Sequence, residues 1–473
     1  MRRLVQKSPF AVTAIMALLC SSGIAQDGGV AREEFEKMKT MLKRLESKTK
    51  EQDATIKRLQ KTIDGQSEKL KKQEDSHKEY SGNLDKVIER LRKSEKAAAP
   101  HVEKWHDRIE LGFAATGVYQ GSSGAKRRFY DHGRNDWYWA PDGDVSDATL
   151  SFDFEILAPV HKHGVAFALI EAGSGDGIDA NIPTLSGFND DADAEDRLHL
   201  SELWYEHGWR DDKVRLRVGK LDLTTSFDTN EVANDETAQF LSSAFVNNVA
   251  VEWPAGDYTP GAMVWISPWE WLDLGYAVAE AHDDWDDVFD NTFHIWEIDF
   301  KPKPSGRQGN YRVYAWLNDL VHQDIKYPAR QRQSGYGIGL SLDQEVTDHL
   351  ALFTRYGWQR ECVYEYEDAW SFGFQLKGDL WKRPTDHLGF AFGIISMGGN
   401  WKDYHEVPVV DFHYRDFPEG IVPGNERHIE LYYSFQAHDR LVISPHVQWV
   451  GNAMGDRQSD DVWVGGVRAQ LTF

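Results

Sequence analysis

Two different hydrophobic periods divide the chain near Pro100. Between residues 31 and 96, apolar side chains recur every seven residues and no proline interrupts the pattern. With Phe35 as position a, twelve of the 18 a and d positions are apolar. Because a solvated single helix has no reason to keep this period over its whole length, the segment predicts a parallel coiled coil and hence a homo-oligomer. We expect a trimer, but Ile at two a positions does not by itself decide between two and three strands.

After Pro100 the period changes to two, which is typical of β-strands. Residues 148–156 place apolar side chains on one face and polar side chains on the other. Links such as 301–306 are short, whereas 187–197 and 282–291 are long and acidic. Alternating short and long links are typical of outer-membrane β-barrels. The same alternation recurs at residues 214–218, 293–300, 336–342, 372–376, 428–435 and 463–473.

The region from Asp107 to Phe473 has the length of a large barrel. Its 367 residues exceed an ordinary soluble β-sandwich, and no linker divides them. Sixteen strands would leave about 23 residues for each strand and its link, and eighteen strands fit nearly as well. The 18 Trp, 18 Tyr and 23 Phe of the chain would supply aromatic girdles at the membrane interfaces. We therefore expect an all-β fold, a transmembrane antiparallel barrel of about 16 strands, preceded by the α-helical coiled coil.

The two ends of the chain indicate export to the outer membrane. Residues 1–25 have the basic start, apolar stretch and small terminal residues of a secretory signal. The last strand alternates up to Phe473, which favours the closing strand of an outer-membrane barrel over that of a soluble sandwich. We divide the chain into a signal peptide at 1–25, a periplasmic coiled-coil helix at 26–100 and an outer-membrane barrel at 101–473.

The net charge of −23 is an average over unlike parts. Residues 1–99 carry 22 Lys and Arg against 15 Asp and Glu, whereas residues 100–473 carry 31 against 61, a net of −30. An acidic barrel repels phosphate backbones, so we expect no nucleic-acid partner.

The sequence has no esterase elbow, zinc-protease motif or phosphate loop, and we expect neither an enzyme nor a cofactor. Acidic runs at 190–193 and 283–287 lack the spacing of a calcium loop, so we expect no metal site.

Residues 214–248 contain ordered blocks such as Val218-Gly219-Lys220, Phe227-Asp228-Thr229-Asn230 and Ala244-Phe245-Val246-Asn247-Asn248. With these blocks the stretch resembles a known family, the carbohydrate-selective, OprB-like porins. Leu223 and Val249 depart from the pattern, because family members often have proline there. The resemblance implies an outer-membrane porin that passively admits sugars and similar small polar solutes, and it does not cover the coiled coil. The matching blocks are Val218-Gly219-Lys220, Phe227-Asp228-Thr229-Asn230, Ala233-Asn234-Asp235, Gln239-Phe240-Leu241 and Ala244-Phe245-Val246-Asn247-Asn248, with further matches at 201–204, 343–344, 353–358 and 430–433.

The same stretch has a composition suited to a sugar-binding constriction. Carboxylate, amide and guanidinium groups pair with hydroxyl groups, and aromatic rings pack on the C–H face of a sugar. The alternative is that Asn and Asp only cap turns and that the loop braces the barrel wall. The candidate constriction residues are Glu202, Trp204, Arg215, Arg217, Lys220, Asp222, Phe227, Asp228, Asn230, Asn234, Asp235, Gln239, Asn247, Asn248 and Arg355.

The function that we expect is carbohydrate-selective diffusion across the outer membrane of a Gram-negative-type bacterium. The partners would be outer-membrane lipid, the sugar and further copies of the chain. Two alternatives stay open. The net charge of −30 would also suit a general, cation-preferring pore. The coiled coil would also suit a structural anchor that tethers the membrane to the cell wall.

Overall fold

The computed structural model describes residues 109–473, apart from 126–127, 132–135, 140–143, 193–196, 255–257, 283–284, 286–287, 289, 328 and 406–421. The expected signal peptide and coiled coil lie outside this part of the chain. Among the described residues, no helix is long and apolar enough to cross a bilayer.

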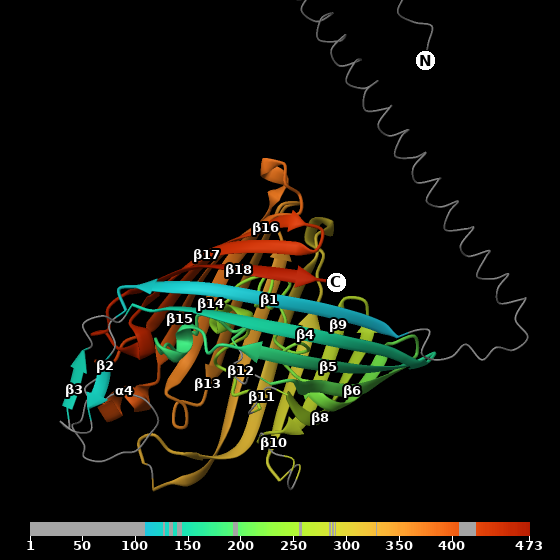
Figure 1. Cartoon of the computed structure of the whole chain (residues 1–473). Helices are drawn as coiled ribbons and strands as arrows, with labels where there is room; N and C mark the ends of the chain where they lie inside the picture. The colour runs from blue at the N-terminus through green and yellow to red at the C-terminus, as the bar shows by residue number, and fades with distance from the viewer. Residues whose placement is uncertain are drawn as a thin grey trace, which may run out of the picture. The chain divides into compact units, whose positions relative to one another are not determined.

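The described chain forms one closed antiparallel barrel of sixteen strands (Figure 1). Each barrel strand pairs with the next one along the chain, and β18 closes the ring on β1. A separate hairpin of β2 (Arg128–Asp131) and β3 (Asp136–Trp139) lies between β1 and β4 in the sequence. The expected all-β barrel of about 16 strands is therefore confirmed, and the count of 18 is not. The barrel strands are β1 (Glu110–Ser123), β4 (Ser146–His161), β5 (Gly164–Ser174), β6 (His199–Trp209), β7 (Val214–Asp222), β8 (Tyr258–Trp269), β9 (Leu272–Glu280), β10 (Thr292–Phe300), β11 (Gly309–Gln323), β12 (Gln331–Glu345), β13 (Leu350–Gln359), β14 (Tyr366–Lys377), β15 (His387–Met397), β16 (Glu426–His438), β17 (Leu441–Gly451) and β18 (Val462–Thr472).

The two faces of each strand differ in composition, as the period of two predicts. In β18, Trp463 is 54% exposed on the outside, whereas its neighbour Val464 and the nearby Arg468 are almost fully buried on the lumen side. In β4, Leu150 is exposed and Thr149 is buried in the same way. Apolar side chains can face outward here because lipid, unlike water, solvates them without cost.

Short turns and long loops alternate around the barrel. The turns that join β4 to β5, β6 to β7 and β8 to β9 have only a few residues, and Glu110 and Thr472 lie at the same end as these turns. Figure 1 shows the β2–β3 hairpin and α4 (Gly399–His405) at the opposite end. Barrels of this type keep the short turns in the periplasm and the long loops outside the cell. The predicted short link at 301–306 and the long link at 187–197 are both confirmed.

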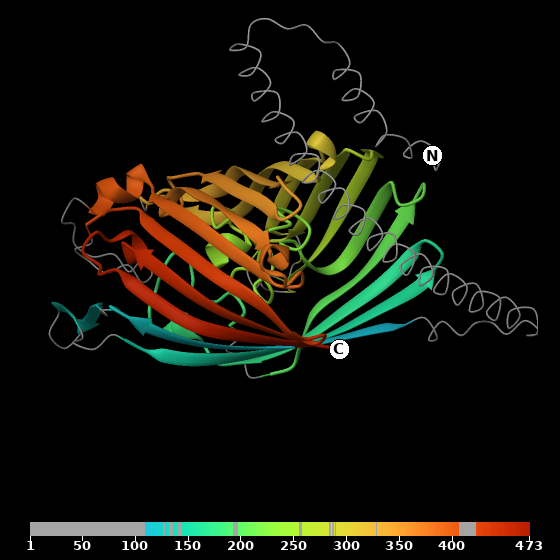
Figure 2. The ribbon, with the colours of Figure 1, turned by 90° about the horizontal axis from the view of Figure 1, so that it is seen from above.

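Two of the long loops fold into the barrel (Figure 2). The long inner loop, residues 223–257, joins β7 to β8, and the short inner loop, residues 175–198, joins β5 to β6. The long inner loop contains the one-turn helix α3 (Ser243–Val246), and the short inner loop contains η2 (Ile178–Ala180). Their apolar side chains meet the lumen face of the wall, so the buried core of this protein lies inside the barrel.

Phe240 of the long inner loop shows how this core is packed. Its ring is fully buried and lies 4.9 Å from the ring of Tyr432 on β16 and 5.6 Å from the rings of Phe245 and Phe353. Burial of one such ring contributes about 2–3 kcal/mol. The aromatic cluster therefore holds the loop against the wall at β13 and β16.

We expect Phe240→Ala to destabilise the barrel by about 3 kcal/mol or more, because it leaves a cavity among three aromatic rings. Samples would be heated to a series of temperatures before electrophoresis. The temperature at which the folded, fast-migrating band disappears should be lower for the variant than for the wild type. Phe372→Ala is the matched control, because Phe372 is 47% exposed on the outer face, where lipid fills the space. Equal stability of the two variants would show that the loop does not depend on this cluster.

Candidate channel and constriction

Arg355 of β13 anchors the long inner loop inside the lumen. Its side chain is 2% exposed. Nη1 donates to the Phe245 carbonyl at 2.6 Å, and Nη2 donates to the Asp228 carbonyl and to Asn234 Oδ1, each at 2.9 Å. Nε lies 3.2 Å from Asp228 Oδ2. One guanidinium group therefore binds the beginning, the middle and the end of the loop.

Asp228 joins the two ends of the loop directly. Its Oδ2 accepts a hydrogen bond from the backbone N–H of Asn248 at 2.7 Å, and its own N–H donates to Glu297 Oε2 of β10 at 2.8 Å. The Asn248 side chain then donates to the hydroxyl of Tyr314 on β11 at 2.7 Å. Asp228 has a φ of 56°, a left-handed conformation that this short polar residue tolerates better than most. The loop is thus closed on itself and attached to β10 and β11, in addition to Arg355 of β13.

Strands on the far side of the barrel hold the tip of the same loop. Glu430 of β16 accepts hydrogen bonds from the N–H groups of Leu241 at 2.8 Å and Ser242 at 3.0 Å. Arg468 of β18 donates to the Gln239 carbonyl at 3.0 Å. The loop joins β7 to β8, and β16 lies halfway round the closed ring from β8, so the loop crosses the lumen and does not merely line one side of it.

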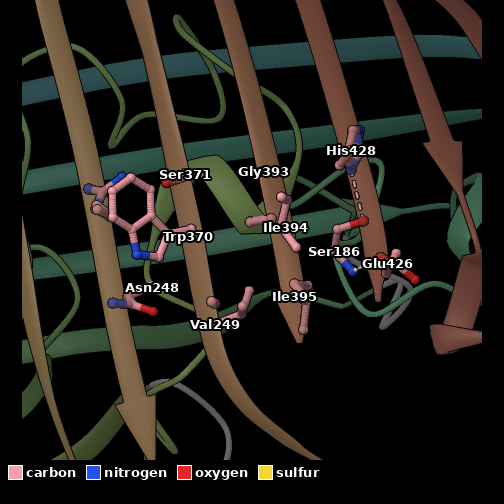
Figure 3. A pocket seen from close by; sticks show the side chains of 13 residues that line it. Ser186, Asn248, Val249, Trp370, Ser371, Gly393, Ile394, Ile395, Glu426 and His428 are labelled. Atoms are coloured by element: carbon pink, nitrogen blue, oxygen red, sulfur yellow. Dashed lines mark hydrogen bonds between the residues drawn. The ribbon is translucent and has the colours of Figure 1, made fainter. Parts of the chain in front are cut away.

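The short inner loop packs against the long one. Glu426 of β16 accepts hydrogen bonds from the N–H groups of Leu185 at 2.9 Å and Ser186 at 2.8 Å. His428 lies 2.8 Å from the Ser186 hydroxyl (Figure 3). The cavity between these groups and the wall has a volume of about 10 Å³, which is the size of one water molecule. The two loops therefore pack closely against each other and the wall at this point.

An aromatic and charged ladder lies on the lumen face of β5, β6 and β7. Trp204 stacks on Phe167 with ring centroids 4.9 Å apart, and Arg217 Cζ lies 3.7 Å from the centroid of the Trp204 ring. Arg217 also pairs with Glu206, with Nη2 to Oε2 at 3.0 Å. The side chains of Arg217 and Glu206 are 18% and 22% exposed. Unlike Arg355, Arg217 can therefore be reached from the lumen.

Strand register explains the ladder. Trp204 pairs with Gly219 and Glu206 pairs with Arg217 across β6 and β7, so the three polar and aromatic side chains share one face. The Trp204 indole N–H donates to Glu202 Oε2 at 2.9 Å, which fixes the ring. The alternation of these short strands thus brings the cation, the carboxylates and the rings together.

A row of carboxylates occupies the adjacent wall. Asp153 and Glu155 lie on the lumen face of β4, and Asp153 pairs with Glu171 of β5. His199 Nε2 lies 3.8 Å from Glu171 Oε2. Asp235 of the long inner loop interacts electrostatically with Asp153. The open part of the lumen is therefore anionic along β4 and β5 and has the Arg217–Glu206 pair on β6 and β7.

Carboxyl groups of the two inner loops extend this anionic region. Burial raises the pKa of Asp191 to about 7, although the Ser151 hydroxyl donates to it at 2.8 Å. Burial also raises the pKa of Asp179 to about 6. Burial and the nearby Asp190 raise the pKa of Glu236 well above its ordinary value. Asp191 and Asp179 therefore change charge near neutral pH, whereas exposed carboxyl groups stay charged.

The structure separates the predicted constriction residues into groups. One group holds the long inner loop against the wall or against itself. A second group lies on the lumen wall at the ladder, where Arg215 shares the face of Arg217. The first group is Asp228, Asn230, Asn234, Gln239, Asn248 and Arg355, and the second is Glu202, Trp204, Arg215 and Arg217.

The remaining predicted residues lie elsewhere. Asp222 and Asp235 close local turns by accepting hydrogen bonds from Thr224 and Thr237. Phe227 stacks on Trp265 in the core, and Asn247 follows α3. Lys220 lies on the outward face of β7 that it shares with Val218, and its Nζ donates to the Leu200 carbonyl at 2.7 Å. The structure thus does not bring Lys220 to the lumen.

Sequence reasoning missed the short inner loop and its anchors. Glu426, His428 and Glu430 alternate with apolar residues along β16, which already places them on the lumen face. The partners of Glu426 and His428, which are Leu185 and Ser186, lie some 240 residues earlier in the chain, and Glu430 binds Leu241 and Ser242 of the long inner loop. The polar face was therefore visible in the sequence, but the contact was not.

Comparison with known proteins identifies the family. The family described as carbohydrate-selective porin, OprB family, matches residues 142–473. A protein of Acinetobacter baylyi that carries the porin name QuiX is 21% identical over 311 residues, which cover 58% of this chain and 69% of that protein. Porin B of Pseudomonas aeruginosa is 23% identical over 202 residues, which cover 37% of this chain and 44% of that protein.

A solved structure of OprB from Pseudomonas putida, determined at high pH, has the same fold. It covers 77% of this chain and 94% of its own, with a TM-score of 0.64 and 16% identity. The family match covers most of the barrel and includes the 214–248 stretch that carried the resemblance. The chain therefore belongs to the OprB family of carbohydrate-selective porins, and it is an outer-membrane porin for the diffusion of sugars.

Proposed function

We propose that sugars pass the constriction along the ladder of Phe167, Trp204 and Arg217. The supporting observation is the partly exposed Arg217–Glu206 pair, 3.0 Å apart, beside the Trp204 ring. Guanidinium and carboxylate groups bind pairs of hydroxyl groups in a bidentate manner, and ring edges pack against C–H groups. Many polar atoms of the long inner loop bind the wall or one another, so among the described residues a sugar would meet this ladder and the adjacent carboxylates of β4 and β5.

Weak binding is what such a path requires. Arg217 and Glu206 already satisfy one another, so a sugar hydroxyl must compete with an existing hydrogen bond. The net gain of one exchanged hydrogen bond is only about 1 kcal/mol. A porin has to bind its solute well enough to let it enter and weakly enough to let it leave. The ladder meets both conditions.

The other predicted constriction residues are proposed to set the size of the opening. Asp228, Asn248 and Arg355 would hold the long inner loop across the lumen, and Asp222, Asp235 and Asn247 would shape its turns. Their substitution would then change the pore radius for every solute. It would leave the ratio between sugars and other solutes of equal size unchanged.

A second function, preference for cations, is supported by the anionic wall. Asp153, Glu155 and Glu171 face the lumen on β4 and β5, and Asp191 and Glu236 add carboxyl groups from the inner loops. Carboxylates that line a narrow, low-dielectric pore raise the local concentration of cations. We propose that the pore prefers small cations over anions while it admits neutral sugars.

We also propose a role for the N-terminal region, on the heptad pattern alone. Residues 26–100 would form a periplasmic coiled coil that joins three copies of the chain, after removal of residues 1–25 as a signal peptide. Such a stalk would reach toward the cell wall. Neither enzymatic activity nor a cofactor is part of the proposal.

Arg217→Gln should weaken sugar binding, because the ladder loses its charged, bidentate donor. In planar bilayers, the sugar concentration that half-blocks the ion current should rise about tenfold, which corresponds to about 1.4 kcal/mol. Arg307→Gln is the matched control, since Arg307 forms a similar pair with Asp348 at 2.7 Å, but on a turn outside the lumen. Unchanged block in Arg217→Gln would exclude this path.

The preference for cations should fall between pH 8 and pH 6. The raised pKa of Asp191, about 7, leaves this group charged above that pH and neutral below it. The preference for K⁺ over Cl⁻ would be measured from the reversal potential in a KCl gradient. In Asp191→Asn this preference should be smaller than in the wild type at pH 8, and it should change less between pH 8 and pH 6. Asp439→Asn removes an equal charge from an exposed turn and should behave as the wild type. Identical profiles for all three proteins would refute the assignment.

Deletion of residues 31–96 should leave the conductance of one barrel unchanged, because every residue of the ladder and both inner loops lie after residue 160. The deletion should convert trimers into monomers in cross-linking experiments on membranes. It should also loosen the attachment of the outer membrane, measured as release of membrane vesicles. Persistence of trimers without this segment would show that the barrel alone assembles.

A further inference from the structure

A basic pocket lies on the outer rim of the barrel, away from the channel. It has a volume of about 310 Å³ and is lined by Lys402 of α4, Arg427 of β16 and Arg457 of the β17–β18 loop, with Asn425, Asn452 and Ile394. Arg427 and Arg457 are exposed. The pocket gathers three cations, although the barrel region as a whole has a net charge of −30.

The pocket lies directly above the lipid-facing belt. Arg427 shares the outward face of β16 with Ile429 and Leu431, and it pairs with Ile394 of β15. Ile394 in turn pairs with Trp370 of β14, which is 50% exposed on the outer face. These residues lie at the end of the strands that carries the long loops, which is the side of the outer leaflet. The pocket is therefore at the level of lipid headgroups, with acyl chains expected below it.

The pocket is built from fixed segments. The Asn452 side chain donates to the Asn425 carbonyl at 2.9 Å. The Gly424 N–H donates to the Gly455 carbonyl at 2.7 Å, and the Arg457 N–H donates to the Val422 carbonyl at 2.9 Å. Two loops that are far apart in sequence thus hold Arg427 and Arg457 on one concave surface.

The cations of the pocket lack carboxylate partners in the part of the chain that the structure describes. No ion pair within 4.0 Å joins Lys402, Arg427 or Arg457 to a described Asp or Glu. The described carboxylate that acts on Lys402 through space is Asp368 of β14, which also accepts a hydrogen bond from Ser396. Three positive charges that repel one another would be stabilised by a bound anion.

We propose that this pocket binds the phosphate group of a phosphorylated glycolipid of the outer leaflet. Two arginines and a lysine suit a phosphate, because guanidinium groups bind phosphate oxygens in pairs and ammonium adds a point charge. The two asparagine amides suit sugar hydroxyls. Ile394 in the pocket and Trp370, its register partner on β14, suit the acyl chains, which a free anion would not need. The site would fix a lipid to the barrel wall beside β15 and β16.

Binding to the purified full chain in detergent, measured by native mass spectrometry, tests this site. The probes are bisphosphorylated lipid A, the same lipid after removal of both phosphates, and inorganic phosphate. The variant is Lys402→Gln/Arg427→Gln/Arg457→Gln. The matched control, Lys162→Gln/Lys213→Gln/Lys303→Gln, removes three exposed charges from the short-turn end. Two measurements check that each variant is folded. They are the fast-migrating band of unheated samples on a gel, and the block of the ion current by sugar in planar bilayers.

The wild type and the control should bind the phosphorylated lipid at least tenfold more tightly than the variant does. They should also prefer it at least tenfold over the dephosphorylated lipid. Should the triple variant fail to fold, Arg427→Gln alone should reduce binding by about threefold or more. Equal binding by the variant and the wild type, or equal loss in the control, would overturn the proposal. Inorganic phosphate that binds as tightly as the lipid would also overturn it in favour of a free-anion site.

Discussion

The contact of Arg355 with the long inner loop is the constraint on which the rest of this structure depends. A guanidinium group on a side chain that is 2% exposed is stable only when its charge and its N–H groups are satisfied. Here the carboxylate of Asp228 and the carbonyl groups of Asp228 and Phe245 satisfy it, together with the amide of Asn234. Because these groups come from the two ends and the middle of the loop, Arg355 can be buried only when the loop is folded across the lumen.

This constraint places the core of the protein inside the barrel. The outer face contacts lipid, which is as apolar as the side chains themselves, so no hydrophobic driving force brings apolar side chains together there. Within the lumen, water is present, and apolar burial stabilises the fold in the ordinary way. Phe227, Phe240 and Phe245 of the long inner loop are therefore buried against the inner wall, whereas Phe372 and Trp463 stay exposed on the outside. The loop serves as core and constriction at once.

The same arrangement accounts for the channel. Many polar atoms of the long inner loop bind the wall or one another, which is why we propose that a solute meets the wall of β4 to β7 in the described part of the chain. That wall carries carboxylates on one side and the Arg217–Glu206 pair on the other. A neutral sugar can exchange hydrogen bonds with the pair, while the carboxylates act on ions over a longer range. Sugar passage and cation preference can thus coexist in one lumen.

Much of this protein could be predicted from its sequence. The period of two sets which side chains face lipid and which face the lumen, because successive side chains of a strand point to opposite faces. It therefore predicts the alternation of lipid-facing and lumen-facing side chains along the barrel strands. It also predicts the outward position of Trp463 and the shared face of Arg215 and Arg217. The same period places Lys220 on the opposite face from Arg217, although the composition of the stretch led us to count Lys220 among the constriction residues. What only the tertiary structure decided is which polar groups of the loops bind the wall and which remain for a solute. The Asp228 and Arg355 contact joins residues 127 positions apart, and no local pattern encodes the meeting of a loop with a distant strand.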